Sequence, residues 1–515
     1  MAQRRSASPE VAALLGGLMP GAGHWYAGHR RLGLVLIGIS LLAAIPLAVL
    51  LVLIFFVSGA SLALDVSRPF FSHPEYLLIL LAANLGIFVL RVLSALDAYF
   101  VAGGRFRGPR ALLALTGFAL LVAFVAAPHG WAASRNLALH DLLTYDYSVD
   151  PNQAVPTSTP STTAPSTTLP ASTTMEPGSP TTAASSTAAP TTTAPTTTTT
   201  TTTMLPPLAE RRVNIMLLGA DAAPGRPGIR TDTIIVASVD PVTKATALFQ
   251  LPRNQIELPI PPGHAAYDVW ECHCYPDLIN SLYQYALAHP DQFPGGANAG
   301  ATALMDLVGH LYGIEIHQYA LVELLGFVSV IDALGSLTIT VTAEVEDEQY
   351  TRPGGEEIPV LFTPGTYEMD GEEVLSYARV RRGTDDYTRM GRQRCVLEAI
   401  AAQANPATLI QALPNLVPAV QDSILTDIPI RAWPDFIKLA TEVDTTSIVS
   451  IRFMPRAPEL VGTGTAYVAR TPEGYWVPIV EMIRSTVLTV ISMDSAAAAE
   501  TLRIAPLGEV CGISD

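Results

Sequence analysis

One stretch of this chain, residues 155–204, consists almost entirely of threonine, proline, serine and alanine. It begins "VPTSTPSTTAPS" and closes with an unbroken run of threonines before a single methionine. Residues of these types offer almost no apolar surface to bury, so a segment made of them has no core to fold around. We therefore predict a disordered extracytoplasmic linker over 136–207. The parts of the chain on either side of it must fold separately.

The part before the linker, residues 1–135, has the composition of a membrane protein. Three apolar runs, at 33–57, 76–96 and 111–133, are each long enough to cross about 30 Å of hydrocarbon. A mean hydropathy of +0.33 and a charged fraction of 15% for the whole chain fit such a region. We predict an α-helical membrane region of three spans, preceded by an apolar piece at 11–19 that is too short to span.

Arginines set the predicted orientation of these spans, because positive residues stay on the cytoplasmic side. Only Arg68 lies in the loop between the first and second spans, whereas several arginines precede the first span or lie between the second and third. The arginines on the predicted cytoplasmic side are Arg4, Arg5, Arg30, Arg31, Arg105, Arg107 and Arg110. We predict a multi-pass protein of the cell membrane with a cytoplasmic amino terminus. The residues after 135 are then extracytoplasmic.

After the linker the sequence becomes that of a globular α/β domain, which we predict over 208–490. Short aliphatic runs such as "VNIMLLGA" and "TIIVASVD" are typical of buried strands, and "GEEVLSYARVR" has the periodicity of a helix. Strands mixed with helices in this order predict a mixed central sheet covered by helices on both faces, an α/β/α arrangement. The last residues, 491–515, are small and unpatterned, and we predict a loose tail.

Two acidic residues, Asp221 and Asp232, stand at the ends of two of the predicted strands. If these strands are neighbours, both carboxylates lie at one end of the sheet. That arrangement suits a hard cation such as Mg²⁺ or Mn²⁺, which also takes phosphate oxygens as ligands. The alternative is that both residues cap loops, which is common for aspartate.

The segment "YARVRRGTDDYTRMGRQR", residues 377–394, concentrates arginines in a chain whose formal net charge is -16. Guanidinium groups repel one another unless an anion lies between them, and their planar forks bind phosphate through paired hydrogen bonds. Together with Arg230 and Arg253, they predict a phosphate or pyrophosphate site. Pairing with nearby carboxylates is an alternative that absorbs some of these arginines but not all. The candidate carboxylates are Glu372, Glu373, Asp385, Asp386 and Glu398. The acidic balance argues against nucleic acid as a partner.

The cysteines are Cys272, Cys274, Cys395 and Cys511. Outside the cell an even number is consistent with disulfides, although the spacing leaves their pairing open. The stretch "CHC" around His273 is a weak metal motif, because no second cysteine pair lies nearby. We favour structural cysteines over a metal site.

From about residue 208 to 485, the outer domain resembles the LytR-CpsA-Psr family of cell-envelope phosphotransferases. The matching stretches, in the family's order, are "NIMLLGAD", "RTDTIIVASVDP", "LFQLPRN", "LINSLYQYA", "VIDALGSLTITV" and "GEEVLSYARVRRGTDDYTRMGRQR". Any one of these is a weak signal, whereas all of them in order over most of the domain are a specific one.

The resemblance implies roles for particular residues. Asp221 and Asp232 would hold Mg²⁺ (or Mn²⁺) beside a pyrophosphate. The catalytic residues implied are Arg230, Asp232, Arg253, Arg379 and Arg381. The residues implied to bind pyrophosphate are Arg230, Arg253, Arg379, Arg381, Arg389, Arg392 and Gln393. A polyprenyl chain would lie in an apolar channel, for which the apolar stripes at 321–334 and 394–403 are candidates. Ordinary core is the alternative for these stripes.

Two positions depart from the family's pattern. Asn254 replaces the aspartate of its Pro-Arg-Asp turn, and Ser336 replaces the second glycine of its Gly-Gly turn. If the aspartate orients Arg253, asparagine can still form a hydrogen bond but no ion pair. If the aspartate takes part in proton transfer, asparagine does not replace it.

The activity implied is transfer of a glycan phosphate from a polyprenyl-pyrophosphate carrier to a hydroxyl of peptidoglycan or another cell-wall polymer. No Ser, Cys or His stands out as a nucleophile in these motifs, so we expect direct transfer rather than a covalent intermediate. Two alternatives stay open. One is a pyrophosphatase that hydrolyses polyprenyl pyrophosphate with the same residues. The other is a non-catalytic lipid-glycan sensor or envelope regulator.

Overall fold

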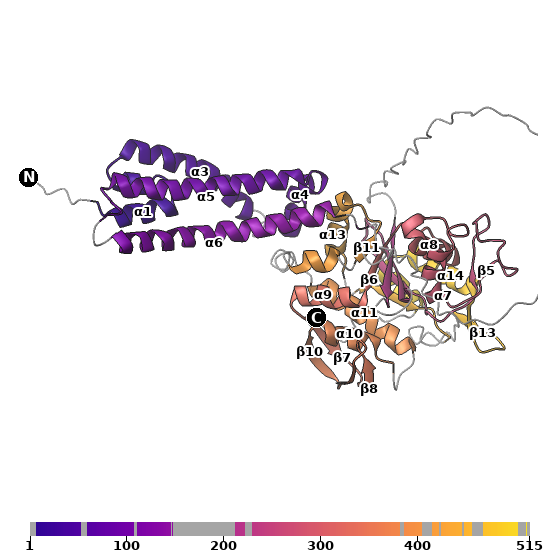
Figure 1. Ribbon diagram of the computed structural model, residues 1–515. Helices are drawn as coiled ribbons and strands as arrows, with labels where there is room; N and C mark the ends of the chain where they lie inside the picture. The colour runs from indigo at the N-terminus through magenta and orange to yellow at the C-terminus, as the bar shows by residue number, and fades with distance from the viewer. Residues whose placement is uncertain are drawn as a thin grey trace, which may run out of the picture.

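The structure is a computed structural model (Figure 1). It describes residues 7–52, 59–107, 111–145, 147, 212–221, 229–381, 386–403, 415–421, 424–444, 447–455, 467–502 and 511. At 43–52 and 59–65 only the backbone is described. Residues 136–144, predicted as part of the linker, are helical instead and continue the helix that begins at residue 111. Apart from 136–145 and 147, the predicted linker lies outside the described residues.

The amino-terminal part is helical, as predicted (Figure 1). The short apolar piece forms α1, which packs against the long helices α5 and α6. The contact with α5 needs glycine: a Cβ on Gly16 of α1 would lie 2.8 Å from the carbonyl oxygen of Ser94. The helices are α1 (Pro9–Leu18), α2 (Ala22–Tyr26), α3 (Arg30–Val52), α4 (Gly59–Ser72), α5 (Glu75–Val101) and α6 (Ala111–Thr144).

Among the described residues, two helices, α5 and α6, are long and apolar enough to cross a membrane. They coincide with the predicted spans at 76–96 and 111–133. The structure therefore gives two candidate spans rather than the three predicted. The predicted span at 33–57 coincides largely with α3, but residues 53–58 and the side chains from residue 43 onward lie outside the described part. The sequence did not predict α4.

The outer domain is built on a six-stranded sheet of order β11-β6-β1-β2-β3-β12. The sheet is mixed, as predicted: β1–β2, β2–β3 and β6–β11 are antiparallel, whereas β1–β6 and β3–β12 are parallel. The strands are β1 (Val213–Ala220), β2 (Thr231–Val239), β3 (Thr246–Gln250), β6 (Gln318–Glu323), β11 (Ile424–Thr426) and β12 (Val449–Arg452).

Helices cover both faces of this sheet, as predicted. Side chains such as Leu218 and Ile234 point to one face and join the main core with α7, α8 and α14. Alternate side chains such as Leu217 and Ile235 point to the other face, toward α11. The alternation follows from the two-residue period of a strand. The covering helices are α7 (Ile279–Ala288), α8 (Ala299–Tyr312), α14 (Val480–Ile491) and α11 (Asp386–Gln403).

A second core lies between α9, α10, α11 and two small sheets. The predicted helix, glycine turn and strand are present, with Gly335 at a φ of 108° between α9 and β7. A capping box fixes the start of α10, in which Asp370 and Glu373 each accept from the other's backbone N–H. These elements are α9 (Leu324–Leu334), α10 (Gly371–Arg379), β7 (Leu337–Val341), β8 (Val345–Thr351), β9 (Glu357–Phe362) and β10 (Gly365–Met369).

The smaller elements lie around the main core and toward the carboxyl end. They are β4 (Leu258–Pro259), β5 (Cys274–Tyr275), η3 (Gly296–Asn298), η4 (Ile430–Ala432), α13 (Trp433–Thr441), β13 (Val468–Arg470), β14 (Trp476–Pro478) and α15 (Ser495–Leu502). The tail predicted as loose is helical in α15, where Ala498 joins the main core. Its alanines are small and are strong helix formers, so they can pack closely.

Two disulfides account for all the cysteines, Cys272–Cys274 and Cys395–Cys511. The cysteines are therefore structural, as favoured from the sequence. The second bond ties residue 511 to α11 and places Cys511 in the core beneath that helix.

Glu398 of α11 gives the domain a pH-dependent stability. Its side chain is buried, and neither carboxylate oxygen has a hydrogen-bond partner among the described residues. Burial raises the pKa of Glu398 to about 7, although Arg394 acts in the opposite direction. Because this pKa lies above the ordinary 4.5, the folded form holds the extra proton, and stability falls as the pH rises from 4.5 to about 7. We expect Glu398→Gln to be more stable than the wild type at about pH 8, by roughly 2 kcal/mol, and similar at about pH 5 in urea unfolding.

Glu271→Gln is the matched control, because Glu271 is exposed. It should keep the pH dependence of the wild type. If Glu398→Gln also keeps that dependence, Glu398 is not the proton-binding group.

Candidate active site

A cavity of about 610 Å³ opens between the central sheet and helices α9, α10 and α11. Apolar side chains of β1, β2, β6, α9 and α11 form part of its walls. Seven of the nine predicted site residues line it: Asp221, Asp232, Arg253, Arg379, Arg381, Arg389 and Gln393. Arg230 and Arg392 do not. The cavity thus has a charged part and an apolar part.

The antiparallel pairing of β1 with β2 brings Asp221 and Asp232 to the same end of the sheet, as predicted. Ala220 pairs with Thr231, and the backbone N–H of Asp221 donates to the carbonyl of Arg230 at 2.8 Å. Both carboxylates line the cavity.

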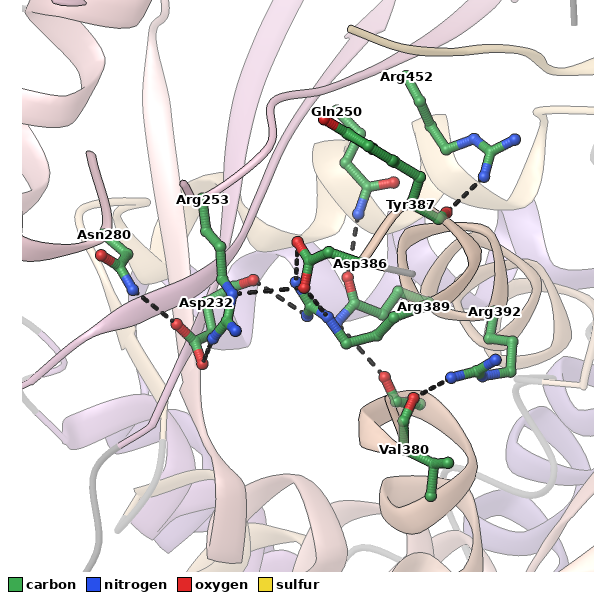
Figure 2. Close-up of polar contacts among 12 residues, drawn as sticks. Asp232, Gln250, Arg253, Asn280, Val380, Asp386, Tyr387, Arg389, Arg392 and Arg452 are labelled. Atoms are coloured by element: carbon green, nitrogen blue, oxygen red, sulfur yellow. Dashed lines mark hydrogen bonds and ion pairs between the residues drawn. The ribbon is translucent and has the colours of Figure 1, made fainter. Parts of the chain in front are cut away.

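Asp232 is held from two sides (Figure 2). Its Oδ2 accepts from Nη1 of Arg253, just beyond β3, and its Oδ1 accepts from Nδ2 of Asn280 in α7 at 3.0 Å. Burial acts to raise the pKa of Asp232, but Arg253, Asn280 and Arg389 outweigh it and lower that pKa below its usual value. Asp232 is therefore a carboxylate at neutral pH.

Asp386, the first residue of α11, joins two arginines into the same network (Figure 2). Its Oδ1 accepts from Nε of Arg389 at 3.0 Å and its Oδ2 from Nη2 at 3.1 Å, while Nε of Arg253 lies 3.5 Å from Oδ1. Nη1 of Arg389 donates to the backbone carbonyl of Asp232 at 3.2 Å. Two guanidinium groups, two carboxylates and the backbone carbonyl of Asp232 therefore close into a ring of contacts. Local pairing, the alternative drawn from the sequence, does occur for Arg389.

Arg379 ends α10 on the other side of the cavity. Its Nη1 donates to the hydroxyl of Tyr350 at 3.1 Å, and its Nη2 lies 3.8 Å from Oδ1 of Asp221. The guanidinium carbon is 5.7 Å from the centre of the Tyr350 ring. Tyr350 of β8 therefore positions Arg379 beside Asp221.

Arg381 faces the same network. Burial and repulsion from Arg253 and Arg389 lower its pKa, against the attraction of Asp386 and Asp232. A phosphate group among these arginines would reduce that repulsion. Arg230 is exposed outside the cavity, and its predicted role stays a prediction.

Two arginines of the same segment are structural. Arg392 is buried, and it donates from Nε to the carbonyl of Tyr377 at 2.7 Å and from Nη2 to the carbonyl of Val380, at the end of α10 (Figure 2). Arg394 is also buried, and its Nη1 donates to the carbonyl and hydroxyl of Ser450 at 3.1 and 2.7 Å. Arg392 therefore points away from the cavity that it was predicted to line. Arg382 lies outside the described residues.

Gln393 lines the cavity, and its Oε1 accepts from Nε2 of Gln250, at the end of β3, at 3.0 Å. Sequence reasoning assigned no role to Gln250, Asn280 or Tyr350. Asn280 stands inside a stretch that resembles the family, so its type and position could have been noticed. Tyr350 is far from every motif, and no signal in the sequence marked it.

The departure at Asn254 does not alter the contacts of Arg253. The ion-pair partners of Arg253 are Asp232 and Asp386, and Asn254 does not line the cavity. The orientation of Arg253 therefore does not depend on an aspartate at 254.

Comparison with known proteins places the chain in a family. The sequence model of the LytR_cpsA_psr family matches residues 178–473, more than half of the chain. The chain belongs to the LytR-CpsA-Psr family. The resemblance inferred from the motifs is confirmed.

Two curated relatives and one solved structure illustrate the similarity. The chain is 28% identical over 233 residues to the polyisoprenyl-teichoic acid–peptidoglycan teichoic acid transferase TagU of Enterococcus faecalis, which is 44% of this chain and 65% of that protein. It is 26% identical over 219 residues to the regulatory protein MsrR of Staphylococcus aureus, which is 42% of this chain and 57% of that protein. It therefore spans less than two thirds of either relative. The crystal structure of Bacillus subtilis TagV aligns with a TM-score of 0.39 at 20% identity, over 57% of this chain and 99% of that chain.

Arg379 lines the cavity, whereas Arg392 donates to buried backbone carbonyls, and paired substitutions test whether the two arginines have different roles. Arg392→Met should destabilise the domain by about 3 kcal/mol, because it leaves buried carbonyls without their donor. Arg379→Met should cost less than about 1 kcal/mol, because Arg379 is partly exposed. It should nevertheless weaken binding of inorganic pyrophosphate at least about tenfold. Urea unfolding and titration calorimetry measure the two effects.

Arg470→Met is the control, since Arg470 is exposed and lies outside the cavity. An Arg392→Met variant of wild-type stability that no longer binds pyrophosphate would show that Arg392 belongs to the site.

Proposed function

We propose that this LytR-CpsA-Psr protein is an extracytoplasmic phosphotransferase. It moves a glycan phosphate from a polyprenyl-pyrophosphate carrier to a hydroxyl of peptidoglycan or another cell-wall polymer. The observation that carries the proposal is that one cavity combines a charged part with an apolar part. A lipid-linked pyrophosphate has the same division into a charged group and an apolar chain.

The charged part suits a pyrophosphate. Arg253, Arg379, Arg381 and Arg389 approach it from a turn after β3, from the end of α10, from the residues that follow α10 and from α11. Guanidinium groups on different elements can contact several phosphate oxygens at once. Because Asp386 and Asp232 hold two of them, these arginines need little rearrangement when an anion binds.

The apolar part suits a polyprenyl chain. Leu217 and Ile235 of the sheet, Phe327 of α9 and Leu397 of α11 all line the cavity. Burial of apolar surface is worth roughly 25 cal/mol per Å², so a long lipid gains considerably from such walls. The sequence left open whether the apolar stripe at 321–334 forms core or lines a channel. It contributes to both, since Phe327 lines the cavity whereas Ile331 lies in the second core.

Asp221 and Asp232 fit a Mg²⁺ or Mn²⁺ ion that is shared with the substrate. In the described part of the chain, no group of three or more His, Cys, Asp or Glu residues could hold a metal by itself. Two carboxylates are what Mg²⁺ takes when phosphate oxygens and water complete its shell. When bound, the ion would neutralise charge on the pyrophosphate.

The residues of the chain contribute binding, orientation and charge stabilisation. The acceptor hydroxyl attacks the phosphorus that carries the glycan, the bond to the bridging oxygen breaks, and polyprenyl phosphate leaves. The arginines stabilise the negative charge on the oxygens of the transferred phosphate. Asp232 or Asp221 accepts the proton of the hydroxyl. The described lining contains no Ser, Cys or His, which supports direct transfer.

Location is part of the same proposal. We place α3 in the membrane as a third span beside α5 and α6. An odd number of spans then separates the cytoplasmic amino terminus from the α/β domain, which lies outside. The name of TagU describes a teichoic acid transferase that works between a polyisoprenyl carrier and peptidoglycan, which supports the same class of activity here.

A second candidate is an envelope regulator, because MsrR is named a regulatory protein. A lipid-binding sensor would use the same cavity without turnover. A pyrophosphatase would use the same residues with water as the acceptor. The reaction products distinguish the transferase, the sensor and the pyrophosphatase.

The activity test uses the full chain in lipid vesicles with Mg²⁺, a polyprenyl-pyrophosphate oligosaccharide and a peptidoglycan fragment. We expect mass spectrometry to find the glycan phosphate joined to the fragment. Asp232→Ala and Arg379→Ala should each lower the rate about 10²–10³-fold, because each removes charge stabilisation from the reacting phosphate. Asp291→Ala and Arg470→Ala, at exposed sites away from the cavity, should keep the wild-type rate.

Other products would point to other functions. Free glycan phosphate that forms without the fragment indicates a pyrophosphatase. Lipid binding without any product, lost in Arg379→Ala, indicates a sensor.

The apolar walls can be tested by filling them. Val322 of β6 lines the cavity, and Val322→Trp places a large ring in the path of the lipid. We expect the rate with a long-chain polyprenyl donor to fall about tenfold, since the lost burial of a few apolar groups is worth about 1.4 kcal/mol. The rate with a short-chain donor should change little. Leu361→Trp on the exposed side of β9 is the control. An equal loss with both donors would show that the cavity does not bind the chain.

A further inference from the structure

The end of α6 does not lead directly into the threonine-rich stretch, because the chain first binds to the α/β domain (Figure 1). Leu143 and Tyr147 are only 5% and 4% exposed. The ring of Tyr147 lies 5.1 Å from the ring of Trp433, which begins α13. The last turn of a candidate membrane helix is therefore packed against the outer domain.

Backbone contacts strengthen this attachment. The N–H of Thr426 in β11 donates to the carbonyl of Tyr147 at 3.2 Å. Nε2 of Gln421 donates to the carbonyl of Asp141 at 3.0 Å. Because β11 is an edge strand, Tyr147 also covers part of an edge that would otherwise be open.

A second helix of the amino-terminal part reaches the same surface. α4 packs against α13 and η4. Nη2 of Arg68 lies 2.7 Å from Oδ1 of Asp435 in α13. An exposed ion pair contributes little energy, but it shows which surfaces face each other. We call the contact formed by Arg68, Tyr147, Thr426, Trp433 and Asp435 the membrane joint.

The membrane joint lies one strand away from the cavity. Thr426 of β11 pairs with Ala320 of β6, and Ile424 pairs with Val322. Ala320 and Val322 both line the cavity, and β6 continues directly into α9, which supplies another of its walls. The end of α6 is thus coupled through β11 to the apolar part of the cavity.

Both ends of the stretch between residues 147 and 212 are bound to the same domain. Tyr147 binds β11, and Arg212, which precedes β1, donates from Nη1 to the carbonyl of Ser238 at 3.2 Å. Only β6 separates β11 from β1 in the sheet, so these strands lie about 10 Å apart. The contacts between the membrane helices and the domain are therefore made by α4, α6 and Tyr147, all of which precede the threonine-rich stretch.

We propose that the membrane joint seats the domain on the outer surface of the bilayer, with the apolar part of the cavity turned toward the membrane. The polyprenyl chain then passes from the bilayer into the cavity without a long path through water, where each exposed CH₂ group costs about 0.8 kcal/mol. The orientation rests on the contacts above, and its use in turnover rests on the proposed function.

The first test measures the contact without any substrate. In the full chain in vesicles, Arg68→Cys combined with Asp435→Cys should be crosslinked efficiently by a short thiol reagent. The matched control combines Arg68→Cys with Asp291→Cys, at an exposed site between α7 and η3. Equal yields from the two pairs would overturn the membrane joint.

The second test measures whether turnover depends on the membrane joint. The variant combines two changes that release the domain from α4 and α6. About ten Gly/Ser residues are inserted after Thr144, which lengthens the chain there by up to ~33 Å. Asp435→Arg replaces the ion pair with Arg68 by a repulsion. We expect turnover of a vesicle-embedded long-chain donor to fall at least tenfold, and turnover of a soluble short-chain donor to stay unchanged. The matched control combines Asp435→Arg with the same insertion after residue 156, beyond Tyr147, and should be neutral with both donors.

Each outcome has one meaning. If both insertions are neutral with the long-chain donor, the membrane joint does not serve turnover. If both insertions lower turnover equally, the threonine-rich stretch sets the spacing, and the proposal fails. If the wild type transfers no glycan phosphate, the proposed function fails, and the crosslinking result still decides whether the membrane joint exists.

Discussion

The ion pair between Asp232 and Arg253 is the contact on which the arrangement of the site depends. Arginines that converge on one cavity repel one another, and in an interior of low dielectric this repulsion is large. Asp232 and Asp386 offset it for Arg253 and Arg389. The positive charge that remains is available to an anion, so the network keeps its arginines oriented and still attracts phosphate.

The fold brings these charges together from distant parts of the sequence. The antiparallel β1–β2 pair supplies Asp221 and Asp232 at one end of the sheet, and the start of α11 supplies Asp386 and Arg389. Between them, α10 ends at Arg379, and the buried Arg392 fixes that end by donating to its last carbonyls. One arginine of the segment therefore contributes structure so that another can face the cavity.

Local patterns and motifs were enough to predict the first strands of the sheet, α10 and α11, the turn at Gly335 and the common end shared by Asp221 and Asp232. They could not show that Arg389 lines the cavity whereas Arg392 does not. Both arginines stand on α11, and the carbonyls to which Arg392 donates belong to the end of α10. Tyr350 lies in a strand of the second core, far from the motifs, so no pattern linked it to Arg379. The helix α15 escaped notice because a run of alanines and small residues has no clear apolar stripe.

The same limit applies to the threonine-rich stretch. Its composition predicts that it forms no core, but composition does not tell where its two ends are attached. A domain on a long flexible tether samples many orientations, so its cavity meets a membrane-bound lipid at a low effective concentration. A domain packed against the helices that cross the bilayer has one orientation and keeps its cavity near the lipid. The buried contact between Tyr147 and Trp433 is a small one, but it selects the second arrangement over the first.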